Sequence, residues 1–316
     1  MSKFERVAVI AKPQGNISRY VSELCDLITQ TGCVPCLDEN AAAHMPLDCP
    51  FKTGCAESIV RECDVAMAIG GDGTMLGAAR ATAGLGIPVI GINAGRLGFI
   101  TDIVLEDMHR LLPAMLQGQY VADERHLLEG CVWREGKKLF EGIAVNDIGI
   151  SHGRALGMVE YTVYVDGLQM SVQRADGVLV STATGSTAYA MAAGGPIMHP
   201  SVASMLLVPI APHTLSNRPI VLGSHTTIDI EVNETRSAVA SFDAQVLIDV
   251  QAGDVLRVKV SKERFTMLHP VGYNHFDLLR RKLKWNYLPQ AERPVHTPLQ
   301  NQTTPAQIIH PLPLDK

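Results

Sequence analysis

The chain has 316 residues, 47% of them hydrophobic, which is enough material for two domains with sizeable cores. Its 27 Lys and Arg stand against 32 Asp and Glu, and the resulting net charge of −5 carries no electrostatic footprint for nucleic acid. The start has no signal-peptide pattern and no apolar run reaches about 18 residues, so we expect a cytoplasmic protein that does not span a membrane.

The first 120 residues predict an α/β domain. Strands with continuous apolar runs alternate there with segments of helical periodicity. Continuous rather than alternating apolar strands, with helices between them, indicate a parallel sheet covered on both faces. We expect strands at 6–11, 33–37, 64–69 and 88–93, and helices at 17–32, about 55–63, 74–84 and 105–120.

After residue 120 the pattern changes to strands that alternate apolar and polar residues. Turn-forming pairs separate these strands, among them Glu135-Gly136, Asp166-Gly167 and Gly253-Asp254. We therefore expect a second, mainly antiparallel all-β domain over 121–269.

The C-terminal part begins with helical periodicity at 275–285. We expect the segment 270–288 to return to the first domain, which otherwise covers 1–120. Residues 289–316 contain several prolines and show no periodicity, so they are expected to form a disordered tail.

Six of the seven cysteines fall within the first 63 residues. Cys33 and Cys36 have a spacing that can bind zinc or cycle as a dithiol. The chain offers no second, tightly spaced ligand pair, and the stretch has the pattern of a strand. We therefore expect reduced structural thiols and no resident metal site.

A glycine turn with an aspartate at its centre, Asp72 within 70–73, lies between a predicted strand and a predicted helix. Glycine turns in this setting cradle phosphate, because backbone N–H groups and the helix N-terminus point at the anion. The stretch 93–99 follows the next strand, so both loops are expected at the ligand-binding edge of the sheet. The dinucleotide fingerprint lacks its acidic residue, since position 93 is Asn, and a Walker A loop is absent; an ordinary tight turn is the alternative.

Two further motifs lie in the β region. Asn146 and Asp147 are adjacent on a strand, so one of them could be purely structural. The stretch 181–187 is dense in hydroxyl groups and poor in large side chains, and 194–196 follows it as Gly-Gly-Pro. Such a wall can approach a planar polar ligand closely, although a packed turn with capping Ser and Thr is the alternative.

Taken in order, these motifs resemble those of the bacterial NAD kinase family, from the first strand to about residue 288. The Gly-Gly-Asp-Gly turn alone also occurs in lipid kinases, whereas the Gly-Ser-Thr-Ala-Tyr run is more specific. The resemblance is carried by the stretches 70–73, 93–99, 146–147, 181–189, 194–196 and 211–219.

The resemblance implies a reaction. Asp72 would act as general base on the 2′-hydroxyl of the adenosine ribose of NAD, while ATP with Mg²⁺ supplies the γ-phosphoryl group. It also implies a homo-oligomer, dimer or tetramer. A lipid or sugar kinase that shares the glycine turn, or a non-catalytic NAD-binding regulator, remain the alternatives.

The resemblance also implies which residues contact the substrate. The glycine turn meets the diphosphate, the pair 146–147 holds ribose hydroxyls, and 187–192 lines the adenine pocket. Arg174 and Asp176, shortly before the hydroxyl-rich stretch 181–187, are predicted to lie on the same face of a strand. For Arg174, an ordinary surface ion pair is the alternative interpretation. The substrate-binding set is Asp72, Gly73, Asn146, Asp147, Arg174, Asp176, Thr187, Ala188, Tyr189, Ala190, Met191, Ala192 and Gln245.

Overall fold

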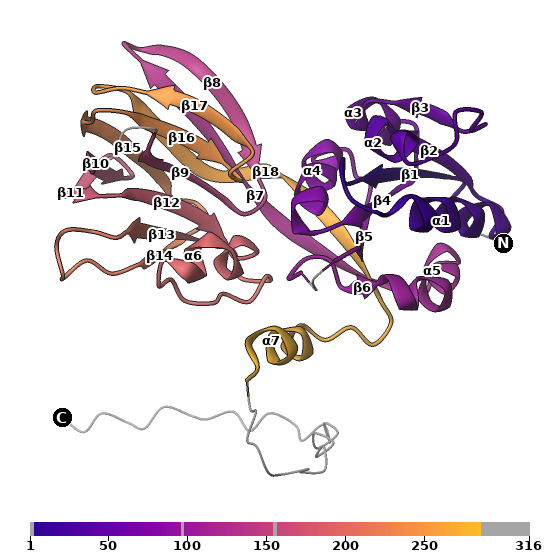
Figure 1. The fold of residues 1–316 in the computed structure, drawn as a ribbon. Coiled ribbons are helices and arrows are strands. Elements are labelled where there is room, and N and C mark those ends of the chain that lie inside the picture. The colour runs from indigo at the N-terminus through magenta and orange to yellow at the C-terminus, as the bar shows by residue number, and fades with distance from the viewer. Residues whose placement is uncertain (1–2, 96–97, 154–156, 286–316) are drawn as a thin grey trace, which may run out of the picture.

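The computed structural model describes residues 3–95, 98–153 and 157–285, and shows two domains side by side (Figure 1). The predicted tail at 289–316 lies outside the described residues. Within the described ranges, no helix has the length and apolar character needed to cross a membrane.

The first domain alternates short strands and helices as predicted. Five strands form a parallel sheet in the order β5-β4-β1-β2-β3. The elements are β1 (Arg6–Ala11), α1 (Ser18–Gln30), β2 (Val34–Asp38), α2 (Glu39–Ala43), β3 (Lys52–Gly54), α3 (Ala56–Val60), β4 (Val65–Gly70), α4 (Asp72–Thr82), β5 (Val89–Asn93), β6 (Ile103–Val104), η1 (Leu105–Asp107) and α5 (Met108–Leu116).

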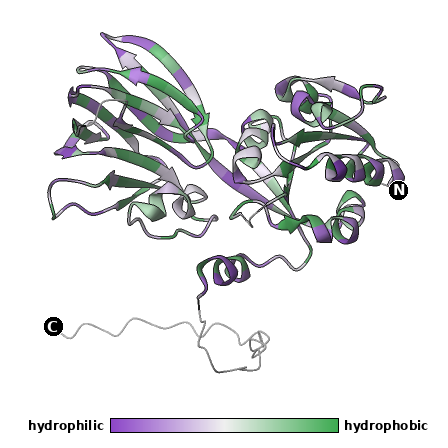
Figure 2. Cartoon of the chain, in the orientation of Figure 1, coloured by the Kyte–Doolittle hydropathy of each residue, from purple (hydrophilic) through white to green (hydrophobic). Residues whose placement is uncertain are grey.

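Both faces of this parallel sheet are covered, which explains the continuous apolar strands. Val7 and Val9 of β1 pack into one core with residues of α1 and α5. Ala8 and Ile10, which alternate with them, pack into a second core with residues of α3 and α4. In Figure 2 these inner strands are green, whereas the covering helix α1 alternates green and purple.

The second domain is an antiparallel sandwich, again as predicted. Its two sheets enclose one core that draws on both. The elements are β7 (Tyr120–Arg134), β8 (Lys137–Ala144), β9 (Asp147–His152), β10 (Val159–Val165), β11 (Leu168–Ala175), β12 (Gly177–Thr182), η2 (Gly185–Thr187), α6 (Tyr189–Ala192), β13 (Ser204–Ile210), β14 (Ile220–Gly223), β15 (Thr227–Glu234), β16 (Ala238–Phe242), β17 (Val246–Val250) and β18 (Val255–Pro270).

Two of the predicted turn pairs form tight hairpins. Glu135 and Gly136 join β7 to β8 with φ of 50° and 75°. Asp166 and Gly167 join β10 to β11 with φ of 50° and 80°. Positive φ at both central positions matches the twist of the flanking strands, which is why such pairs predict hairpins.

The long strands β7 and β18 run through both domains. Their outer halves pair inside the sandwich, and their inner halves pair beside the parallel sheet, where Met267 lies next to Val89 of β5. Phe265 and Met267 therefore belong to the core of the first domain. The two domains share one continuous 12-stranded sheet.

The predicted C-terminal helix is present as α7 (His275–Leu283), capped by the side chain of Asn274. It touches loops of both domains. Lys282 Nζ lies 5.0 Å from the centroid of the Phe99 ring, and the ring of Phe276 lies 5.7 Å from that of His199. In Figure 1, α7 lies below the junction of the two domains.

Candidate active site

Asp72 is the first residue of α4, directly after β4 and Gly71. Its carboxylate accepts hydrogen bonds from Phe99 N at 2.9 Å, Ile100 N at 3.3 Å and the Thr101 hydroxyl at 3.0 Å. The loop that follows β5 thus holds the aspartate of the glycine turn. The two loops predicted to meet at the sheet edge do meet there.

Asn93 and Gly98 support this arrangement from behind. The buried Asn93 side chain donates to the Thr101 hydroxyl at 2.8 Å and accepts from Gly95 N at 3.0 Å. A Cβ at Gly98 would overlap the Asp72 carboxylate, so only glycine fits at that position. Residues 96–97 of the same motif lie outside the described residues.

The three glycines of the turn, Gly70, Gly71 and Gly73, differ in the space that a side chain would have at each position. A Cβ at Gly70 would collide with Thr74, so the packing of the chain itself requires that glycine. A Cβ at Gly71 would meet nothing within 4 Å, and one at Gly73 would meet only Gln245 at 3.6 Å. The missing side chains at Gly71 and Gly73 leave open surface at the N-terminus of α4, where an anionic group is favoured.

Asn146 and Asp147 are held by the buried carboxylate of Asp243. That carboxylate accepts from the backbone N–H groups of Val145 at 3.0 Å, Asn146 at 2.7 Å and Asp147 at 3.3 Å. Asp147 is 8% exposed, and burial together with the neighbouring Asp243 charge raises its pKa to about 7. Asp147 therefore titrates near neutral pH.

Arg80 of α4 connects the Asn146–Asp147 pair to the first domain through Asp243. Its guanidinium donates to Asp243 Oδ2 at 2.6 Å and to the Gln245 side-chain oxygen. The Gln245 amide donates in turn to the carbonyl oxygen of Gly73 at 3.1 Å. A continuous set of hydrogen bonds thus links the glycine turn to Asn146 across the domain junction.

The hydroxyl-rich stretch runs from the end of β12 through the tight turn of η2, and α6 follows it. The Thr182 hydroxyl donates to Val145 O at 2.7 Å and accepts from Gly185 N at 2.9 Å. A Cβ at Gly185 would overlap the Asn146 backbone, so this turn lies directly against the Asn146–Asp147 pair. The Thr187 hydroxyl donates to Thr184 O at 3.2 Å.

The segment after this turn differs in exposure along its length. Ala190 is fully buried, and Tyr189 is 52% exposed. Ala188 and Met191 are half-buried, and Ala192 is exposed.

Arg174 and Asp176 lie apart from the residues described so far. Arg174, with a side chain 63% exposed, faces Glu160 at 4.0 Å across β10 and β11. It lines a separate cavity of about 250 Å³ with Glu160, Glu234 and Arg236. Asp176 lies between β11 and β12, where the chain passes from one sheet to the other.

A cavity of about 550 Å³ opens beside the glycine turn. Gly73, Thr74 and Arg80 line it from the first domain and Gln245 from the second. The first turn of α4 and the Arg80 guanidinium thus meet at one opening, which suits a phosphorylated ligand.

Sequence reasoning missed three residues of this site: Thr101, Arg80 and Asp243. Thr101 lies just beyond the second motif and could have been included by its proximity. Asp243 stands in the Phe-Asp-Ala-Gln stretch that pointed to Gln245, and its φ of 52° marks it as a turn residue. Arg80 carries no local signal, because its partner lies 163 residues away.

Known proteins match this chain over most of its length. The model of the ATP-NAD kinase N-terminal domain matches residues 7–120, and that of the ATP-NAD kinase C-terminal domain matches 145–269. The NAD kinase of Acidovorax sp. (strain JS42) is 47% identical over 290 residues, which are 89% of this chain and 97% of that one. The NAD kinase of Cupriavidus pinatubonensis is 53% identical over 237 residues, 75% of this chain and 78% of that one.

Solved structures show the same fold. A yeast NADH kinase complexed with NADH superposes with a TM-score of 0.81 at 22% identity, covering 90% of this chain and 88% of that one. An NAD kinase from Archaeoglobus fulgidus in complex with ATP superposes with a TM-score of 0.67 at 24% identity, covering 88% and 98%. From the two family models and the curated relatives together, the chain belongs to the ATP-NAD kinase family.

Proposed function

We propose that the protein transfers the γ-phosphoryl group of ATP to the 2′-hydroxyl of the adenosine ribose of NAD, which yields NADP. The observation that carries this proposal is the placement of the Asp72 carboxylate. It stands at the N-terminus of α4, beside two glycines that the chain's own packing does not require. A carboxylate repels phosphate unless it is protonated or a metal neutralises the charge, so its place in a phosphate-binding turn favours a role in proton transfer.

Asp72 has the hydrogen-bonding capacity to act as the base. A carboxylate offers about four acceptor positions, and three of those on Asp72 are filled by Phe99 N, Ile100 N and the Thr101 hydroxyl. Oδ2 accepts only one of these bonds, so we assign the contact with the ribose hydroxyl to Oδ2. The filled positions fix the orientation of the group, and Oδ2 orients the hydroxyl and takes its proton during transfer.

Asn146 and Asp147 are proposed to hold the ribose. Asp147 is 8% exposed and its pKa is raised by burial, so ligand hydroxyl groups that donate to its carboxylate would stabilise the charged form. The turn at Thr187, Ala188 and Tyr189, followed by 190–192, is proposed to flank the adenine.

The phosphates are proposed to lie against Gly71, Gly73 and the cavity that Arg80 lines. Mg²⁺ is commonly held by substrate phosphates and few protein ligands, so we propose that it arrives with ATP. Bound there, it would neutralise phosphate charge that Asp72 otherwise faces.

Arg174 and Asp176 are proposed to contact NAD within a homo-oligomer, dimer or tetramer, where a second subunit adds to the site. We further propose that the protein works in the cytoplasm.

Incubation of the purified protein with ATP, Mg²⁺ and NAD tests the proposal, with NADP formation as the readout. A lipid or sugar kinase would phosphorylate its own alcohol and leave NAD unchanged. A non-catalytic NAD-binding protein would bind NAD without consuming ATP. Either result would overturn the proposed reaction.

A further inference from the structure

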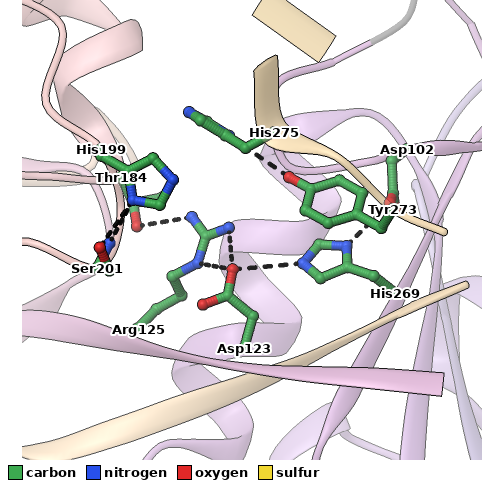
Figure 3. A network of polar contacts seen from close by, with 9 residues as sticks. All are labelled: Asp102, Asp123, Arg125, Thr184, His199, Ser201, His269, Tyr273 and His275. Carbon is green, nitrogen blue, oxygen red and sulfur yellow. Dashed lines mark hydrogen bonds and ion pairs between the residues drawn. The ribbon is translucent and has the colours of Figure 1, made fainter. Parts of the chain in front are cut away.

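A network of charged and polar side chains next to the proposed site links four parts of the sequence (Figure 3). His269 Nδ1 lies 2.9 Å from Asp102 Oδ2, and His269 Nε2 lies 3.5 Å from Asp123 Oδ2. Asp123 accepts from Arg125 Nε at 2.8 Å, and Arg125 Nη1 donates to the Thr184 hydroxyl at 3.2 Å. We call these five residues the buried ionic chain.

The buried ionic chain is shielded from water along most of its length. His269 is 1% exposed and Arg125 is 2% exposed. The ring of Tyr273 stacks on His269, with 3.7 Å between centroids and 7° between planes. Charges in such surroundings are tolerated only when they are paired and hydrogen-bonded, so each member depends on its neighbours.

The charges balance when His269 is an imidazolium. Two cations, His269 and Arg125, then face two carboxylates, Asp102 and Asp123. If His269 were neutral, the group would carry one uncompensated negative charge in a buried place. Removal of a single member is therefore expected to disturb the others, and their effects should not be additive.

Both ends of the buried ionic chain reach residues of the proposed site. Thr184, at one end, accepts the Thr187 hydroxyl on its carbonyl oxygen, and Thr187 is assigned to the adenine pocket. Asp102, at the other end, follows Thr101, whose hydroxyl holds Asp72. The buried ionic chain thus connects the loop that orients the proposed general base Asp72 with the turn that is proposed to flank the adenine.

We propose that Arg125 is a positioning residue for NAD, held by the buried ionic chain so that it fixes the Thr184 turn. This inference rests on the proposed function, since it assigns that turn to the NAD site. Arg125 does not touch the reacting atoms. Its effect reaches the substrate through the Thr184 hydroxyl and the Thr184–Thr187 hydrogen bond.

The protonation of His269 provides an independent readout. The charged and titratable groups that face it are Asp102, Asp123, Arg125, Tyr273 and His275. Burial opposes the imidazolium, but the hydrogen bond to Asp102 and the nearby Asp123 carboxylate outweigh it, and the pKa of His269 is raised. Because the pKa of His269 is raised, the charges of the buried ionic chain balance at low pH, and this balance is lost as the pH rises through that pKa.

The first test measures NAD affinity without ATP, by calorimetry on the full-length protein. Arg125→Met is expected to weaken NAD binding about tenfold or more, and Thr184→Val several-fold, because each loses the charge-assisted hydrogen bond. The double variant should bind no more weakly than Arg125→Met alone. Unchanged affinity in the single variants, or additive effects in the double variant, would overturn the proposal.

Arg134→Met is the matched control for a general loss of stability. Arg134 also lies on β7, and it forms a bidentate ion pair with the buried Asp254 at 2.8 and 2.7 Å, away from the Thr184 turn. It is expected to lower the melting temperature while NAD affinity stays at the wild-type value. If Arg134→Met weakens NAD binding as much as Arg125→Met does, the role of Arg125 is only structural.

The second test compares wild type and His269→Gln between about pH 6 and 9. The ratio of their NAD dissociation constants should be largest at low pH and shrink as the pH rises, because wild type then loses the same charge. Asp147 titrates alike in both proteins and cancels in the ratio. A ratio independent of pH would overturn the role of the imidazolium, and NADP formation by wild type separates either failure from failure of the proposed reaction.

Discussion

Arg80 and Asp243 form an ion pair of 2.6 Å across the domain junction, with the aspartate side chain fully buried and the arginine side chain 21% exposed. The same carboxylate holds the backbone of residues 145–147. One contact therefore fixes the helix that begins with Asp72 relative to the proposed ribose-binding pair.

Arg80→Met should destabilise the protein, because it leaves the Asp243 charge buried without its cation. Loss of one partner of a buried pair costs about 3–5 kcal/mol, and the backbone donors that remain on Asp243 should reduce this to about 2 kcal/mol. Urea unfolding measures the change. Addition of Asp243→Asn should recover part of the loss, since it removes the uncompensated charge. Stability within about 0.5 kcal/mol of wild type would show that the pair contributes little.

Asp72→Asn tests the proposed base. Asparagine keeps the size of the side chain but cannot take the proton, so turnover should fall at least about 100-fold while NAD binding survives. Asp64→Asn is the control, because Asp64 also accepts two backbone N–H groups, at 2.8 and 2.9 Å, but lies before β4, at the opposite end of the strand. Near-normal turnover of Asp72→Asn would remove Asp72 from the role of base.

Asp147→Asn should change stability in a pH-dependent way. The pKa of Asp147 is raised to about 7, so wild type loses stability as the pH rises from about 4, where the unfolded carboxyl ionises, to about 7, where the folded one does. The variant should therefore melt higher than wild type at pH 8, and this advantage should vanish below about pH 4, where the carboxyl is protonated in both folded and unfolded chains. The KM for NAD should rise at the same time, since the amide is a weaker acceptor for ribose hydroxyls. A stability difference that is constant with pH would contradict the assignment.

Arg174→Gln separates a ligand contact from a surface ion pair. If Arg174 reaches NAD, the variant should raise the KM for NAD and shift the ratio of NAD to NADH use. Arg257→Gln is the control, because Arg257 is a similarly exposed arginine paired with Asp229 on the same sheet. Steady-state kinetics with both dinucleotides decide the matter, and an unchanged KM and ratio would leave Arg174 as the partner of Glu160 alone.

The sequence by itself determined the fold class, the turn chemistry and the family. Alternation of Val7 and Val9 with Ala8 and Ile10 on a continuous apolar strand requires cover on both faces, and the structure supplies it. The pair Asp166-Gly167 predicted its hairpin because aspartate and glycine are among the few residues that favour positive φ at the two central positions. These features depend on neighbours within a few residues, which local periodicity records.

Only the tertiary structure decided which side chains meet. The pattern around Arg80 is that of any helix, and its partner Asp243 is set by how α4 packs against the sandwich. His269 lies near the end of a long strand whose register with β7 brings Asp123 within 3.5 Å of it, and no local signal encodes that register. Contacts between residues more than a hundred positions apart follow from strand pairing and domain packing, because many local patterns are compatible with each of them.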